Sequence, residues 1–446
     1  MMGTAAELTE RLRAAAAAEP AGPGVVAAEG TLDRRTLLHC IHGAASVVDE
    51  RREQRVRPDD ARVWLPWLAG CALGGALFRF DGGGSADPPP AHSAAPNAVD
   101  AETPCLAVTT SGSGGAPKAL IRDSAAWLRC FAAEESHLGL SADDRVLALG
   151  APAFSLTPYA ALRALHLGAP LAVLNTVTPG RAAAVLDQFR PTVVYGAPPL
   201  VRMLARCAWE RRLGAPVRRV VTGGAPLTPT QMAAVMDAWP SAALTVFHGA
   251  AETSFISMNE ALDSADLADL GPIFPGVDAR SGADGRLVVR TPYAARAIET
   301  PDGQWCALGD ADGWIVLDDH VAIENGRLRM LGRADHRINV GGAMHDPAPV
   351  EDRFEDFPWV VEVAVVAVPD ARRSENAVVA VVATDDLPPA GVMLEDARHA
   401  CAESPFAIGR VIAIDGDVPR TAGGKLDRKA VADGLAAGTL PTLDIA

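Results

Sequence analysis

Lysine is almost absent from this sequence. Of the 40 basic residues in 446, only Lys118, Lys425 and Lys429 are lysines, and the other 37 (40 minus 3) are arginines. Arginine therefore serves wherever either cation would do, which excludes lysine as a general surface charge. An ammonium group is a compact charge with three donors, unlike the planar guanidinium. Each lysine is for that reason a candidate for chemistry that an arginine would not perform.

Net positive charge is also lacking, because the chain carries a formal charge of −15. Nucleic acids and anionic membrane surfaces attract basic faces, so we expect neither as the main partner. The longest apolar stretch, residues 63–78, contains a proline and three glycines. It is too short and too interrupted to span a bilayer, and we expect it to be a buried segment.

Signals for secretion and for disulfide bonds are missing as well. The first twenty residues lack the cationic-then-apolar order of a secretory signal. The seven cysteines are odd in number and form no CxxC pair, which is typical of free thiols in a reducing cytosol. The sequence thus predicts a cytoplasmic protein, large enough to bury a core in two or more domains.

The main feature that is present is an alternation of β-rich runs and helix-length segments. The expected strands are 145–149, 170–174, 192–195, 218–222 and 243–247, and the expected helices between them are 159–167, 181–189, 200–213 and 229–239. The strands are continuously apolar, as in a parallel sheet that is covered on both faces. The pattern predicts an α/β fold whose large N-terminal body contains layered, mostly parallel sheets.

Two further regions follow this body. Short runs at 285–291, 314–317 and 326–331 lie between Gly and Asp turns and predict a smaller β-rich subdomain. Expected strands at 360–368, 377–383 and 410–414 predict a small α+β C-terminal domain. We therefore expect domains over 1–334 and 335–446, joined by a hinge. The first hundred residues are expected to form a compact block ending in a Gly- and Pro-rich linker, 82–104.

The sharpest local motif is TTSGSGGAPK, residues 109–118. Its small residues offer amides and hydroxyls ahead of a lysine, which suits phosphate oxygens. Surface turns have a similar composition, but the density of donors and the rare lysine favour phosphate. Pro117 rules out a Walker loop, and no glycine completes a dinucleotide fingerprint. The candidate residues are Ser111, Gly112, Ser113, Gly114, Gly115 and Lys118.

Five more motifs follow this loop in a fixed order. They are GGAP at 223–226, FHGAAE at 247–252, WCALGD at 305–310, GRADHRI at 332–338 and PRTAGGKLDR at 419–428. Together with the loop they resemble the motifs of the adenylate-forming superfamily, which includes acyl-CoA synthetases, adenylation domains of peptide synthetases and luciferase. The resemblance covers roughly residues 100 to 430.

This resemblance implies an enzyme that uses ATP and Mg²⁺. It implies that the loop through Lys118 holds the β- and γ-phosphates and that Glu252 holds Mg²⁺, a hard cation suited to a carboxylate beside phosphates. It also implies ribose contacts from Asp310 and Arg333. Apart from the resemblance, a solvated loop acid at 252 and a turn residue at 310 are the plain alternatives. The remaining nucleotide-site candidates are Gly224, Ala225, Pro226, His248 and Gly249.

The C-terminal motif places a second lysine in the expected site. The resemblance implies that Lys425 bridges the substrate carboxylate and the α-phosphate, where negative charge develops. Lys429 lies just outside the motif and is expected at the surface. Asp335 matches the hinge of the family, about which the C-terminal domain would turn between adenylation and thioester formation. That turn would bring the loop around Gly341 and Gly342 into the site.

Four positions depart from the family pattern. Threonines of the family are replaced by Gly114, Ala251 and Leu308, and a lysine is replaced by Asn339. We expect these departures to affect the rate and the fine geometry more than the reaction class. The block before the phosphate loop is also shorter than in many relatives, which suggests a trimmed N-terminal subdomain.

The acid pocket is expected between residues 152–159 and 249–257. Ser155 stands where relatives that activate amino acids carry an aspartate, which disfavours an α-amino acid, and Leu156 and Phe255 favour an acyl or aryl acid. We expect activation of a small carboxylic acid to an acyl-adenylate with pyrophosphate release, then transfer to the thiol of CoA or of the phosphopantetheine of an acyl carrier protein. The alternatives are a nitrogen or oxygen nucleophile, and a non-catalytic nucleotide-binding homologue.

Overall fold

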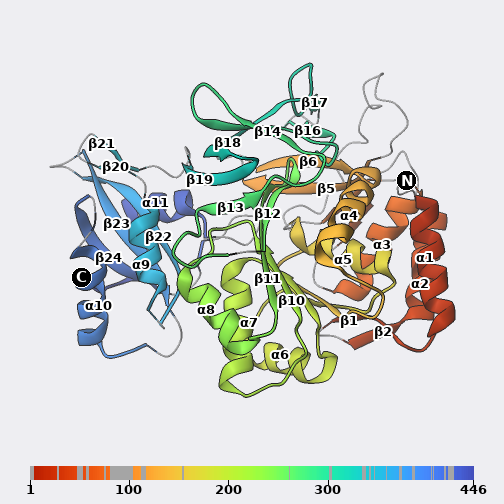
Figure 1. Ribbon diagram of the computed structural model, residues 1–446. Helices are drawn as coiled ribbons and strands as arrows, with labels where there is room; N and C mark the ends of the chain where they lie inside the picture. The colour runs from red at the N-terminus through yellow and green to blue at the C-terminus, as the bar shows by residue number, and fades with distance from the viewer. Residues whose placement is uncertain are drawn as a thin grey trace.

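The structure, a computed structural model, shows a large body and a smaller C-terminal unit beside it (Figure 1). It describes residues 5–27, 30–47, 54–56, 60–74, 77–80, 104–111, 117–152, 155–260, 262–300, 304–333, 338–340, 343–345, 347–357, 359–370, 374–383, 387–402, 404, 406–415, 418–419 and 426–446. The predicted domain boundary between 334 and 335, with its hinge residue Asp335, lies outside these residues, as do Gly341 and Gly342.

An eight-stranded sheet forms the centre of the body, in the order β12-β11-β10-β9-β7-β8-β1-β2. The strands are β1 (Pro23–Ala27), β2 (Gly30–Asp33), β7 (Val146–Leu149), β8 (Leu171–Leu174), β9 (Val193–Gly196), β10 (Arg219–Gly223), β11 (Ala243–Ala250) and β12 (Ser254–Asn259). The six strands from β11 to β1 are parallel, and β12 and β2 add antiparallel edges. The predicted layered parallel sheet is confirmed.

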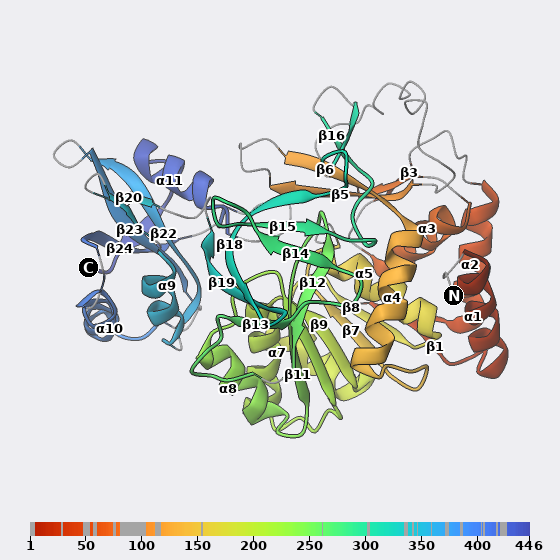
Figure 2. The ribbon, with the colours of Figure 1, turned by 45° about the horizontal axis from the view of Figure 1, so that its top comes forward.

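Helices cover both faces of this sheet. On one face pack α1 (Ala5–Ala18), α2 (Arg34–Val47), α3 (Ala61–Gly74), α4 (Ser124–Leu138) and α5 (Leu156–Leu167), and on the other α6 (Pro179–Ala184), the π-helix η1 (Val185–Phe189), α7 (Pro198–Glu210) and α8 (Pro229–Ala238). Figure 2 shows α4 and α5 on one side of β9–β11 and α7 on the other. Side chains alternate accordingly, with Tyr195 of β9 in the first core and Val194 in the second.

The long apolar stretch noted in the sequence is a buried helix. It forms most of α3, in which Trp64, Leu65 and Leu68 are fully buried, as predicted. Over the part of the chain that the structure describes, no helix combines the length and the apolar character needed to cross a bilayer.

A second sheet of six strands shows that the first hundred residues are not a separate block. Its order is β17-β16-β6-β5-β4-β3, with β3 (Gln54–Val56), β4 (Phe78–Phe80), β5 (Pro104–Ser111), β6 (Pro117–Asp123), β16 (Ala297–Glu299) and β17 (Trp305–Ala307). β3 and β4 extend this sheet beside β5, while β1 and β2 extend the central one. These short strands bury residues such as Val25 and Phe78 only by joining larger sheets. The expected linker lies outside the described residues, except that Pro104 begins β5.

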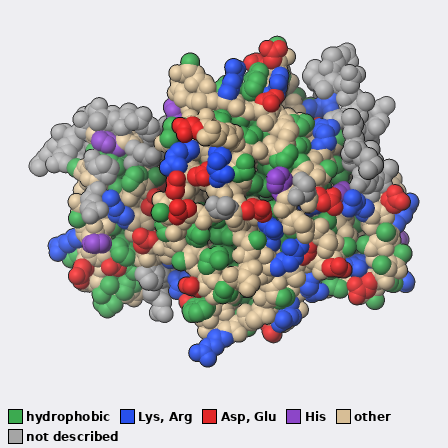
Figure 3. All heavy atoms as spheres, viewed as in Figure 1, with side chains coloured by type: hydrophobic (Ala, Val, Ile, Leu, Met, Phe, Trp, Pro, Cys, Tyr) green, Lys and Arg blue, Asp and Glu red, His purple; other side chains and the backbone are tan. Residues whose placement is uncertain are grey.

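The predicted β-rich subdomain is an antiparallel five-stranded sheet. Its order is β13-β19-β18-β15-β14, with β13 (Asp269–Pro272), β14 (Asp278–Ser281), β15 (Arg286–Arg290), β18 (Ile315–Glu324) and β19 (Arg327–Arg333). Arginine–aspartate pairs lie along its edge, for example Arg327–Asp269 at 2.6 Å. Acidic and basic side chains are interspersed on the face of the molecule seen in Figure 3.

The C-terminal unit has an α+β fold with cores of its own, as predicted. It contains the pair β20 (Ile338–Val340) and β21 (Ala343–His345), the sheet β22 (Val360–Asp370), β23 (Ser374–Ala383), β24 (Ile408–Ile414) and β25 (Thr442–Asp444), and the helices α9 (Ala348–Glu355), α10 (Ala390–Ala402) and α11 (Arg428–Ala437). Lys429, in the first turn of α11, has a 70% exposed side chain that pairs with Asp433. Its predicted surface position is confirmed.

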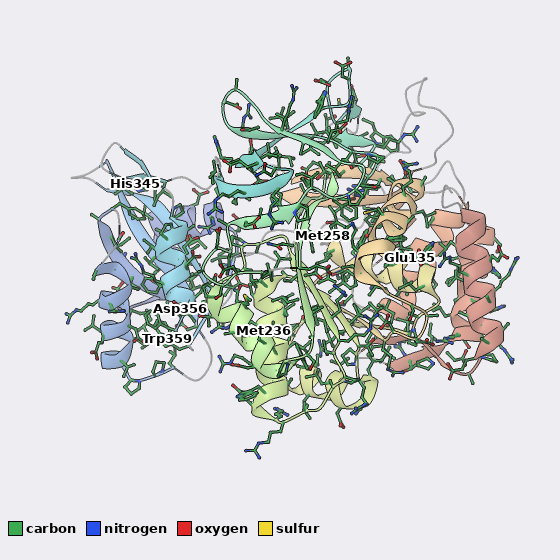
Figure 4. The ribbon with its side chains drawn as sticks, viewed as in Figure 1. Glu135, Met236, Met258, His345, Asp356 and Trp359 are labelled. Carbon is green, nitrogen blue, oxygen red and sulfur yellow. The ribbon has the colours of Figure 1, made fainter. Side chains whose placement is uncertain are left out.

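Polar contacts join the C-terminal unit to the body. The Gln231 side chain of α8 donates to the Glu355 carboxylate at 2.8 Å, and the Thr230 hydroxyl donates to Asp356. Arg202 of α7 is buried and donates to the backbone oxygen of Val360 at 3.2 Å. Figure 4 shows Asp356 on the side of the unit that faces α8. The first turn of α8 therefore meets the end of α9.

Candidate functional site

The carboxyl ends of the parallel strands meet at one edge of the central sheet, where ligands bind in open α/β folds. At the end of β10, a Cβ on Gly223 would lie 2.3 Å from the backbone oxygen of Phe247 in β11. Gly224 has a φ of +78°, a conformation that favours glycine. Glycine is thus needed here for steric reasons, and Gly224, Ala225 and Pro226 leave the sheet at this edge.

The next predicted segment forms the hairpin between β11 and β12. A Cβ on Gly249 would lie 2.3 Å from the backbone oxygen of Ser254. The Thr253 hydroxyl accepts from the Ala250 N–H at 3.3 Å and donates to the Ser254 oxygen at 3.2 Å. Glu252 lies in this turn and is half-buried. The hairpin therefore holds its acidic residue on a fixed backbone at the same edge as Gly224.

A buried arginine connects this hairpin to the strand that carries Lys118. Arg122 of β6 is 1% exposed, and its guanidinium donates to the backbone oxygens of Ala251 (2.6 Å) and Tyr293 (3.1 Å). Lys118 lies on the same strand, opposite Thr110 in the β5–β6 ladder. Arg122 was not among the residues expected from the sequence, although an arginine directly after the apolar residues ALI, 119–121, was the available signal.

His248 is connected to the position of Arg333 through an aspartate. Its Nε2 lies 3.3 Å from Oδ2 of Asp319 in β18, and the His248 and Asp319 side chains are 12% and 4% exposed. Asp319 is the ladder partner of Arg333 in β19. Asp319 thus contacts one predicted site residue through its side chain and pairs with the backbone of another. Sequence reasoning missed Asp319, which is the second of two adjacent aspartates.

Asp310 lies in the tight turn after β17. Its Oδ1 accepts from the N–H groups of Asp312 (3.0 Å) and Trp314 (2.9 Å), and the residue is exposed. Asp310 is therefore a turn residue in the fold, which was the alternative to a ribose contact. The same bonds fix the orientation of the carboxylate, so the turn also presents an acidic group at a defined place.

Part of the predicted site lies outside the described residues. This applies to Gly112, Ser113, Gly114 and Gly115, to Lys425, and to the side chains of Ser111, Lys118 and Arg333. The residues on either side of the loop are described: Ser111 is the ladder partner of Pro117 in the antiparallel pair of β5 and β6. The loop is thus the connection of a hairpin whose second strand also carries Arg122.

Comparison with known proteins assigns the chain to a family. The sequence model of the AMP-binding enzymes matches residues 10–296, nearly two thirds of the chain. The chain belongs to the AMP-binding enzyme family. This membership, together with the fold, confirms the family resemblance seen in the six motifs.

Individual curated relatives of this AMP-binding enzyme share less than a third of their aligned residues with it. It is 29% identical over 299 residues to the uncharacterized acyl-CoA ligase YhfT of Bacillus subtilis, covering 63% of this chain and 59% of that protein. The chain spans about three fifths of the length of the curated relatives it matches first. The anthranilate CoA ligase AuaEII, in complex with anthranoyl-AMP, is similar in structure, with a TM-score of 0.76, 17% identity, and 97% and 98% of the two chains covered.

A second protein of similar structure is named for the formation of an amide bond rather than for ligation to CoA. The amide bond synthetase McbA from Marinactinospora thermotolerans gives a TM-score of 0.70 at 22% identity, with 97% of this chain and 99% of that chain covered. At such identities both neighbours establish the fold of this AMP-binding enzyme and nothing finer.

The two segments expected to line the acid pocket meet in this AMP-binding enzyme. Tyr159, in the first turn of α5, and Phe255 of β12 have ring centroids 5.0 Å apart, edge to face. Leu156 at the start of α5 is buried. Phe154 lies outside the described residues, and Ser155 is the N-cap residue of α5 without a side-chain capping bond.

Proposed function

We propose that this chain uses ATP to convert a carboxylic acid, acyl or aryl rather than α-amino, to an acyl-adenylate with release of pyrophosphate. One observation carries the proposal: the segments 224–226 and 248–252 lie at one sheet edge, and Arg122 connects the second of them to the strand of Lys118. An edge formed by the carboxyl ends of parallel strands is where nucleotides bind in open α/β folds.

The reaction must overcome repulsion between two anions. An oxygen of the substrate carboxylate attacks the α-phosphorus, and the bond from that phosphorus to the bridging oxygen of the β-phosphate breaks. In the proposed site, Lys118 and the amides of residues 111–115 hold the β- and γ-phosphates and offset their charge. Lys425 bridges the carboxylate and the α-phosphate from the C-terminal domain.

The residues present fit a nucleotide and a magnesium ion. Mg²⁺ binds through one or two carboxylates together with phosphate oxygens and water, and Glu252 offers one half-buried carboxylate. Within the described part of the chain, no group of three or more His, Cys, Asp or Glu residues could hold a metal alone. Phosphate oxygens would therefore complete the coordination, and the ion would neutralise charge on them.

The remaining roles concern the nucleoside. Residues 224–226 lie beside the adenine, and Asp310, oriented by its turn, accepts from the ribose hydroxyls. Arg333 is the second sugar contact. The Asp319 carboxylate lies beside His248, and Asp319 is the ladder partner of Arg333, so β18 brings two residues of the proposed nucleotide site to one place in the sheet.

We further propose that the acyl group passes to a thiol, either of CoA or of the phosphopantetheine of a carrier protein. The chain then works as two domains, 1–334 and 335–446, and rotation of the second exchanges Lys425 for the segment around 341–342. The similarity to acyl-CoA ligases supports a thiol acceptor. The fold shared with an amide bond synthetase supports a second candidate, in which an amine takes the acyl group.

Carboxylate-dependent ATP–pyrophosphate exchange on a panel of acids tests the first half-reaction. We expect exchange with at least one aryl or short acyl acid. Absence of exchange with every acid would instead support a non-catalytic nucleotide-binding homologue. Adding CoA, a phosphopantetheinylated carrier protein or an amine to the active acid, with mass analysis of the product, then identifies the acceptor.

A further inference from the structure

A network of ionisable side chains lies fully buried between α4, α5 and β9, and the proposed reaction does not use it. Arg163 of α5 places Nε 3.0 Å from Oε2 of Glu134 on α4, and both side chains are 0% exposed. The hydroxyls of Tyr159 (3.1 Å) and Tyr195 donate to the same carboxylate. Nη1 of Arg163 also lies 3.1 Å from Nδ1 of His166. Groups from both α5 and β9 thus converge on one acidic side chain.

Net stability does not account for such a network. Burial raises the pKa of Glu134, while the charge of Arg163 and the two tyrosine hydroxyls oppose that effect. Buried ion pairs are commonly no more stabilising than apolar residues of the same size, because desolvation offsets their attraction. The network does fix the orientation of two side chains, because the Glu134 carboxylate accepts from both hydroxyls and so holds each tyrosine ring in one position.

The Tyr159 ring held in this way belongs to a continuous wall of buried rings. Its centroid lies 5.6 Å from Trp127 and 5.0 Å from Phe131, both on α4, and 5.0 Å from Phe255 on β12. Phe255 in turn lies 4.7 Å from Phe247 on β11. Each of these residues is less than 10% exposed, so the wall belongs to the buried core that joins the helices to the strands.

This wall lies directly behind the edge where the nucleotide motifs converge. Tyr159 is in the first turn of α5, and Tyr195 is one residue before the end of β9. Phe247 directly precedes His248, and a Cβ on Gly223 would lie 2.8 Å from the Phe247 ring. An acid that reacts at this edge and extends inward between α5 and the β11–β12 hairpin therefore meets the wall.

We propose that the Tyr159 ring, held by Glu134, forms the closed inner end of the acid pocket and restricts the enzyme to short or single-ring acids. This inference rests on the proposed function and names its substrate class. Tyr159 is the specificity-determining residue, and Glu134 is a positioning residue that acts through it. A long acyl chain would have to displace the ring and remove a hydrogen bond from a buried carboxylate.

The test compares ATP–pyrophosphate exchange with benzoic, butyric, octanoic and dodecanoic acids. The wild type is expected to use benzoic or butyric acid and to have at least about a hundredfold lower kcat/KM for dodecanoic acid. Tyr159→Ala opens the inner end, so the ratio of octanoic to benzoic kcat/KM should rise at least about tenfold. Tyr159→Phe keeps the ring but removes its hydrogen bond to Glu134, so its ratio should rise, by less than the ratio of Tyr159→Ala.

Two further variants separate pocket shape from general destabilisation. Phe189→Ala makes a similar cavity in the core on the other face of the sheet, and the ratio should not change there. Tyr159→Leu replaces Tyr159→Ala if the latter does not fold, as judged by circular dichroism. Good exchange of dodecanoic acid by the wild type would overturn the role given to Tyr159 and leave the proposed function standing. An unchanged ratio in a folded Tyr159→Ala or Tyr159→Leu protein would do the same. Absence of exchange with any acid overturns the proposed function as well.

Discussion

Arg122 is the residue that most directly connects the parts of the proposed site. Its guanidinium is buried and donates to the backbone oxygens of Ala251 and Tyr293, so it holds the Glu252 turn against β6. The Tyr293 oxygen also accepts from the Ser254 hydroxyl at 3.0 Å, so loss of the Arg122 guanidinium mainly deprives the partly buried Ala251 oxygen of its donor. The role that these bonds give Arg122 in the proposed site is to position the turn that carries Glu252.

We predict that Arg122→Met lowers the free energy of unfolding by about 2–4 kcal/mol and the exchange rate at least about tenfold. Urea unfolding and pyrophosphate exchange measure the two effects. Arg129→Met is the matched control, because Arg129 donates to the neighbouring backbone oxygen of Pro292 at an exposed position. Its unfolding free energy should change by no more than about 0.5 kcal/mol. Equal effects of the two substitutions would contradict the role given to Arg122.

At the scale of secondary-structure elements, the glycine at the end of β10 determines how closely two strands approach. A Cβ at Gly223 would overlap the backbone oxygen of Phe247, so β11 would have to move away from β10. Segments 224–226 and 248–252 are both expected to contact the nucleotide, and both would shift with that movement.

We predict that Gly223→Ala destabilises the protein by at least about 2 kcal/mol and weakens ATP binding. Gly391→Ala in α10 is the control, since a Cβ at Gly391 meets nothing within 4 Å. Alanine in place of that helical glycine should be neutral or stabilise by up to about 1 kcal/mol. Thermal unfolding and nucleotide titration check both variants, and normal ATP affinity in Gly223→Ala would contradict the placement of the nucleotide.

The secondary-structure elements also show which parts of the fold could be predicted from the sequence. The continuously apolar runs predicted the parallel strands β7 to β11 correctly, because each needs burial on both faces. The strands β1 to β4 were missed, because they lack the strand–helix alternation of the later region and are stable only when paired with larger sheets. Arg122, Asp319 and the Glu134–Arg163 pair were missed for a similar reason: their partners lie far along the chain or on another element.

At the scale of the whole molecule, the contact between α8 and α9 holds the C-terminal unit against the body. Burial raises the pKa of Glu355 to about 7, the nearby carboxylates of Asp352, Glu351 and Glu362 add to the rise, and Arg202 opposes it. The folded pKa lies above the unfolded value. The stability from protonated Glu355 is thus fully present below about pH 4.5 and is lost as pH rises through about 7.

We predict that Glu355→Gln removes this dependence. Relative to the variant, the wild type should lose thermal stability between pH 5 and pH 8, by an amount on the order of 1–3 kcal/mol. Glu10→Gln on the exposed side of α1 should follow the wild type at both values. Parallel pH profiles of the wild type and Glu355→Gln would show that Glu355 does not titrate in this range.

The central claim is that this AMP-binding enzyme activates a carboxylic acid at a site served by a lysine from each domain. Carboxylate-dependent ATP–pyrophosphate exchange in the wild type, Lys425→Ala and Lys429→Ala tests it most directly. We predict exchange with at least one aryl or short acyl acid, a loss of at least about a hundredfold in Lys425→Ala, and wild-type exchange in Lys429→Ala, whose lysine pairs with Asp433 at the surface. Undiminished exchange in Lys425→Ala, or none in the wild type with any acid, would contradict the claim.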